Sequence, residues 1–142
     1  MHNIPIVLIS ASTLSSLQQE IEKHQDFRLI TVIKPQETSE IPKLKGTYKD
    51  FLIVTDVEGI DTQTAVVQNI LLRNVGYQVF LSCNKDYTDL CQVTTDIYKF
   101  MVEQKGKGSI RTEIIITEHA LEILGDVKSI VEEFERKFLN KQ

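Results

Sequence analysis

The chain has 142 residues, 42% hydrophobic and 25% charged, a composition ordinary for one globular domain and unlike that of a disordered segment. A formal net charge of −4, from 20 acidic and 16 basic residues, argues against non-specific binding to nucleic acid. The apolar run near the N-terminus is too short for a signal peptide or a membrane span. We therefore expect a single cytoplasmic domain over residues 1–142, with no membrane segment.

The first third of the chain alternates short apolar runs with a helical pattern. Residues 5–10 and 28–33 are apolar and rich in β-branched side chains, which predicts two strands. Residues 34–50 contain Pro35, Pro42 and Gly46, so we expect a loop with about one helical turn there. Between the two strands, apolar residues at spacings of three and four predict a helix with one apolar stripe: Leu14, Leu17 and Ile21.

The rest of the chain repeats this alternation. Residues 51–55 are the most apolar run and are expected to form the central strand, followed by a helix over about 63–74 capped by Asp61 or Thr62. The remaining predicted elements, in order, are a strand over 77–82, a helix over about 87–104, a strand within 109–117, and a helical region divided at Gly125-Asp126 into 120–124 and 127–138. The last helix carries an apolar stripe that must bury itself on its own sheet or on another chain.

Strands that alternate with helices imply a mostly parallel sheet covered on both faces. Right-handed crossovers between five such strands favour the order 2-1-3-4-5. The sequence therefore predicts an α/β, flavodoxin-like three-layer sandwich with a five-stranded, mostly parallel sheet.

One carboxylate follows the predicted central strand directly. Asp56 ends the apolar run 51–55, and open α/β proteins bind ligands at the carboxyl edge of the sheet. Polar residues that end the neighbouring predicted strands should lie at the same edge. They form a candidate ligand or phosphate pocket, which consists of Ser10, Ser12, Asp56, Glu58 and Ser82.

Several catalytic and cofactor motifs are missing from the sequence. It has no P-loop, no G-x-G-x-x-G after the first strand and no G-x-S-x-G elbow. Cys83 and Cys91 form no C-x-x-C pair and are expected to be reduced thiols, so neither a metal nor a cofactor is expected. His24 and His119 are expected to be surface residues.

Asp56 at the end of the third strand and Ser82 at the end of the fourth resemble the layout of the response-regulator receiver family. The resemblance covers residues 5–83 and implies a phosphoacceptor role for such an aspartate. Two departures stand against that chemistry. Ser10-Ala11-Ser12 replaces the family's Mg²⁺-binding acids, and Thr117-Glu118-His119 replaces its Lys-Pro step.

The resemblance implies an atypical receiver or pseudo-receiver, a non-catalytic regulatory module that acts through contacts with a protein partner or as a homo-oligomer. A first alternative is a small enzyme or phosphate-ligand-binding protein that uses the sheet-edge pocket around Asp56. A second alternative is a structural or assembly subunit that self-associates through its last helix.

Overall fold

The computed structural model describes residues 4–12, 16–48, 51–72, 75, 77–82, 95, 99 and 114–138. Some of the predicted features lie outside this part of the chain: Leu14, Cys83, Cys91, residues 109–113 and all but two residues of the predicted helix 87–104.

Five parallel strands form one sheet, and β3 lies at its centre. The strand order is β2-β1-β3-β4-β5, and every neighbouring pair is parallel. This confirms the predicted five-stranded α/β sheet of order 2-1-3-4-5. The strands are β1 (Ile4–Ile9), β2 (Phe27–Ile33), β3 (Leu52–Asp56), β4 (Tyr77–Leu81) and β5 (Ile114–Ile116).

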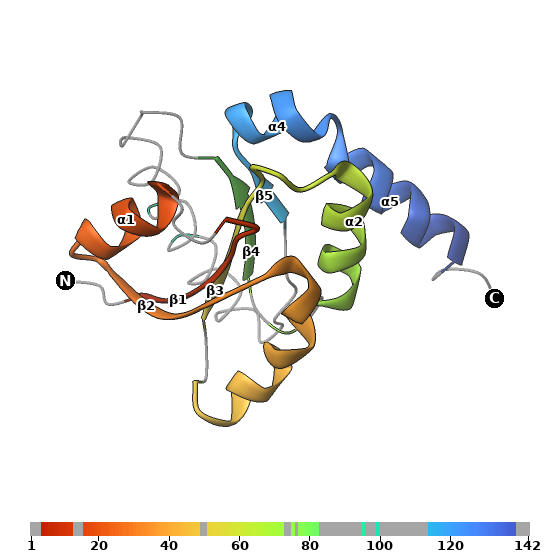
Figure 1. The fold of residues 1–142 in the computed structure, drawn as a ribbon. Helices are drawn as coiled ribbons and strands as arrows, with labels where there is room; N and C mark the ends of the chain where they lie inside the picture. Colours follow the sequence, from red (N-terminus) through yellow and green to blue (C-terminus); the bar gives the residue numbers. More distant parts are fainter. Residues whose placement is uncertain are drawn as a thin grey trace.

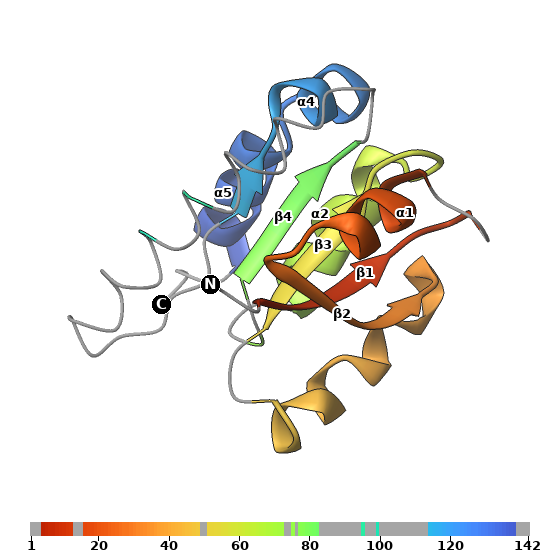
Figure 2. The same cartoon turned by 90° about the vertical axis from the view of Figure 1, so that its left-hand side faces the viewer.

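Helices lie on both faces of the sheet (Figure 1). Helix α1 (Ser16–Lys23) covers one face, while α2 (Thr62–Leu71) and α5 (Val127–Phe138) pack side by side on the other. The short α4 (Glu118–Leu124) joins β5 to α5, and two 3-10 helices, η1 (Pro35–Glu40) and η2 (Pro42–Gly46), connect β2 to β3. Figure 2 shows the sheet from the side on which α1 lies.

The side chains of β1 alternate between two hydrophobic clusters, as the period of a strand requires. Ile6 and Leu8 join the cluster that contains Leu17 of α1, whereas Val7 and Ile9 face the cluster built with α2 and α5. Burial on both faces explains why this strand is a continuous apolar run.

The C-terminal helical region divides where the sequence predicts. Gly125 adopts a φ of 72°, a left-handed conformation that ends α4 and that glycine adopts without a steric penalty. Thr117 caps the start of α4 by accepting the Ala120 N–H at 3.4 Å. Val127 and Val131 are fully buried in the core, so part of the α5 stripe packs within its own chain.

Two sequence-based expectations are wrong. Residues 35–46 hold two 3-10 helices instead of a loop with one turn, because Pro35 and Pro42 each occupy the start of a helix, where no backbone N–H is needed. His24 is buried, with 8% of its surface exposed, because its ring stacks on Phe27 with the ring centroids 4.4 Å apart.

Candidate functional site

The carboxyl edge of the sheet brings the predicted site residues together in space. Ile9 of β1 pairs with Thr55 of β3, so Ser10 and Asp56, the residues that follow them, lie beside each other. Asp56 pairs in turn with Leu81 of β4, the residue before Ser82. Ser10, Asp56 and Ser82 are all buried, with 2%, 4% and 5% of their surfaces exposed.

Short-range hydrogen bonds occupy these polar groups. The Ser10 hydroxyl donates to the Ser12 carbonyl oxygen at 3.3 Å and accepts the Ser12 N–H at 3.2 Å. Asp56 Oδ1 accepts the Glu58 N–H at 3.1 Å, and the Ser82 hydroxyl donates to Glu58 Oε1 at 3.2 Å. The five residues therefore form two small networks, Ser10 with Ser12 and Asp56 with Glu58 and Ser82.

Only the ends of these networks face solvent, since Ser12 and Glu58 are exposed. Among the residues that the structure describes, no group of three or more His, Cys, Asp or Glu side chains is placed to hold a metal ion. In the same residues, no helix is long and apolar enough to cross a membrane.

A polar crevice lies next to these networks at the same edge. Its volume is about 330 Å³, and it is bounded by the segments that follow β1, β2 and β3. None of the five predicted residues lines it. Its lining consists of Ala11, Lys34, Pro35, Gln36, Gly59, Ile60, Asp61 and Thr64.

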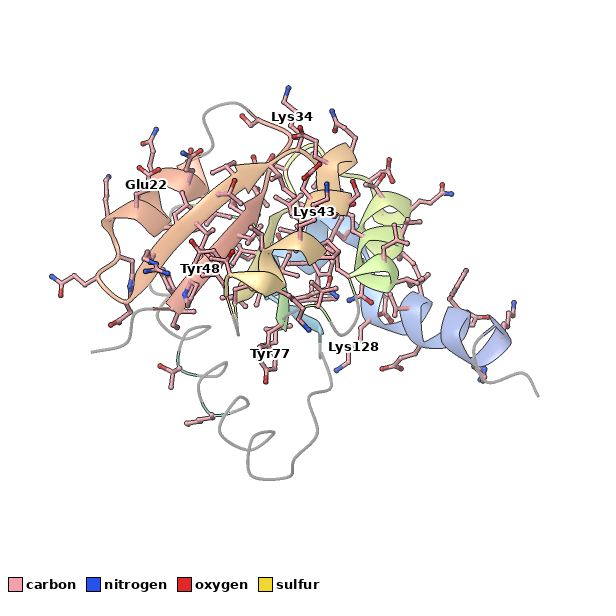
Figure 3. The ribbon with its side chains drawn as sticks, turned by 90° about the horizontal axis from the view of Figure 1, so that it is seen from below. Glu22, Lys34, Lys43, Tyr48, Tyr77 and Lys128 are labelled. Carbon is pink, nitrogen blue, oxygen red and sulfur yellow. The ribbon has the colours of Figure 1, made fainter. Side chains whose placement is uncertain are left out.

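Two charged residues of opposite sign line the crevice. Asp61 caps α2 by accepting the Thr64 N–H at 2.7 Å, and its hydrogen bonds with Thr64 hold the pKa of this carboxyl below its ordinary value of 3.8. Lys34 extends outward from the end of β2 (Figure 3). The sequence signal for Lys34 was its position directly after a predicted strand, the criterion that also singled out Asp56.

The second hollow is an apolar groove between α2 and α5, with a volume of about 560 Å³. Four apolar side chains on its walls are exposed: Val67 (47%), Leu71 (64%), Ile130 (44%) and Phe134 (38%). The other lining residues are Thr62, Gln63, Val66 and Ile70.

The α2 wall of this groove carries no charge. Residues 62–71, with the sequence TQTAVVQNIL, contain no Asp, Glu, Lys or Arg. On α5, Glu133 and Lys137 pair with each other at 3.6 Å. Spacings of four residues, Val67 to Leu71 and Ile130 to Phe134, place two apolar rows along the groove.

Comparisons with known proteins give no family for this chain. No protein-family model matches it, and neither a curated protein sequence nor a solved structure matches it significantly.

Proposed function

We propose that this protein is a non-catalytic interaction module of the atypical-receiver type, and that its partner binds in the groove between α2 and α5. The observation that carries the proposal is the exposure of four apolar side chains on the walls of one groove. Contiguous exposed apolar surface of this kind is typical of protein–protein contact sites.

The chemistry of the groove favours a protein partner that presents an apolar helix face. The cores of protein interfaces are depleted in charged residues, and the α2 wall has none. The two apolar rows can receive side chains at helical spacing from a third helix, as in helix-in-groove recognition.

The carboxyl edge supports the non-catalytic part of the proposal. Asp56 ends β3, the position to which the receiver resemblance assigns a phosphoacceptor. One of its oxygens accepts the Glu58 N–H, and the nearby Ser82 hydroxyl donates to Glu58. These bonds give the polar groups a structural role in fixing the turn after β3.

The test is a photo-crosslinking experiment with a benzophenone amino acid in place of Val67, a groove residue that is 47% exposed, carried out in the native host and analysed by mass spectrometry. Leu71→Asp, introduced into the same crosslinking chain, is the disrupting variant. It is a suitable choice because Leu71 is the most exposed of the four groove side chains, at 64%, so its replacement leaves the core intact.

The matched control is Leu121→Asp on α4, where the side chain is 39% exposed and lies outside the groove. We expect Leu71→Asp to abolish capture of a partner protein and Leu121→Asp to preserve it, with both variants folded by circular dichroism. A crosslink only to a second copy of the chain would favour the assembly-subunit alternative. Equal capture by both variants would refute the groove as the docking surface.

A further inference from the structure

The polar crevice occupies the switch point of the sheet. Strands β1 and β3 are neighbours, but the chain leaves β1 toward α1 on one face and leaves β3 toward α2 on the other. In open α/β sheets the segments that diverge at such a point leave a crevice in which ligands bind. The crevice here has that position, since Ala11 follows β1 and Gly59 follows β3.

The walls of the crevice are held in place by packing and hydrogen bonds. Gly59 adopts a φ of 78°, and a Cβ atom added at this position would lie 3.6 Å from the Ala11 Cβ, so the loops after β1 and β3 approach each other closely. On the opposite wall, the buried side chain of Gln68 donates to the Pro35 carbonyl oxygen at 3.4 Å. A cavity with fixed walls loses little freedom when a ligand binds.

The charges of the crevice are opposite and do not neutralise each other. Within the described part of the chain, the Lys34 ammonium makes no ion pair, and no salt bridge joins it to Asp61. Asp61 remains ionised at neutral pH because its bonds to the start of α2 favour the carboxylate. The polar residues Gln36 and Thr64 and the buried Ile60 also line the crevice.

We infer that this crevice binds a small zwitterion of the amino-acid kind, whose carboxylate meets Lys34 and whose ammonium group meets Asp61. A ligand with one charge would meet one favourable and one repulsive group, whereas a ligand that carries both charges complements the two. The volume of about 330 Å³ is at the small end of ligand pockets and suits such a molecule. This site is separate from the groove and adds a ligand to the proposed interaction module.

The experiment measures binding by isothermal titration calorimetry on the whole chain, with the common L-amino acids tested one by one at millimolar concentration. Acetate, methylammonium and inorganic phosphate serve as probes with charge of one sign. The test variants are Lys34→Gln and Asp61→Asn, and asparagine keeps the ability to cap α2.

Two matched controls share the local chemistry but lie outside the crevice. Asp126→Asn replaces another capping aspartate, which accepts the Ser129 N–H at 3.1 Å, and Lys128→Gln replaces another exposed lysine. We expect at least one amino acid to bind, each test variant to weaken it about tenfold to a hundredfold, and the controls to leave the affinity unchanged.

Three results would overturn the inference. They are the absence of binding by every amino acid, binding of acetate or phosphate as tight as that of any amino acid, and equal losses in the test and control variants. None of them bears on the groove, because Leu71→Asp and Leu121→Asp report on partner capture alone.

Discussion

The carboxyl edge of the sheet and the α2–α5 groove differ in the kind of side chain that each buries and exposes. At the edge, the polar groups of Ser10, Asp56 and Ser82 are buried, and each finds a hydrogen-bond partner within the chain. In the groove, apolar side chains such as Leu71 and Phe134 stay exposed. A polar group is satisfied by one neighbour at short range, but an apolar surface is removed from water only by another surface. A second molecule therefore has more to contribute at the groove.

The largest expected effect separates true core from groove. Phe80→Ala empties a fully buried site in β4 and should lower the free energy of unfolding by about 3–5 kcal/mol. Phe134→Ala removes a side chain that is 38% exposed and should cost about 1 kcal/mol or less. Urea denaturation followed by circular dichroism measures both values. Similar losses for the two variants would mean that Phe134 belongs to the folding core and that the contrast between the regions is false.

A smaller effect concerns Asp61, which lies between the two regions at the start of α2. Its pKa is below 3.8 because the folded chain donates hydrogen bonds from Thr64 to the carboxylate. Its contribution to stability is therefore complete above the pKa of the unfolded chain and is lost as the pH falls through the lower folded value.

Asp61→Asn should make the acid side of the stability–pH curve shallower below about pH 4 and leave its shape near neutrality unchanged. Thermal unfolding at a series of pH values, with Asp126→Asn for comparison, provides the measurement. A steeper acid side in the variant would reverse the sign expected for a stabilised carboxylate.

The last prediction is the absence of a reaction at Asp56. Treatment with acetyl phosphate and Mg²⁺ should add no phosphoryl group to Asp56, since among the described residues no cluster of acids is placed to hold a metal beside it. Intact-mass spectrometry decides the matter, and Asp56→Asn controls for modification elsewhere. A phosphoryl group that is present on the unchanged chain and absent from Asp56→Asn would make the carboxyl edge a reactive site and favour an active receiver.

The strand order could be predicted because it follows from local patterns and a chirality rule. The apolar runs 51–55 and 77–82 mark buried strands, and right-handed crossovers leave few ways to order them. The position of Asp56 at the edge of the sheet followed from the same reasoning, and the pairing of β3 confirms it.

The features that could not be predicted depend on contacts between distant segments. The stripe of α5 was visible in the sequence, but the sequence could not tell that Val131 is buried while its neighbour Ile130 is exposed. That distinction depends on how α5 packs against α2. The crevice could not be predicted for the same reason, since Lys34 and Asp61 come to line one hollow only when β2 and β3 lie on either side of β1.

Helix α2 forms a wall of both hollows. Asp61 and Thr64 at its start border the crevice, while Thr62 and Gln63, which lie between them in the sequence, border the groove. A displacement of this first turn would change both hollows at once. Thermodynamic linkage then requires reciprocity: a ligand that raised the affinity for a partner by some factor would itself be held more tightly, by that same factor, when the partner is bound.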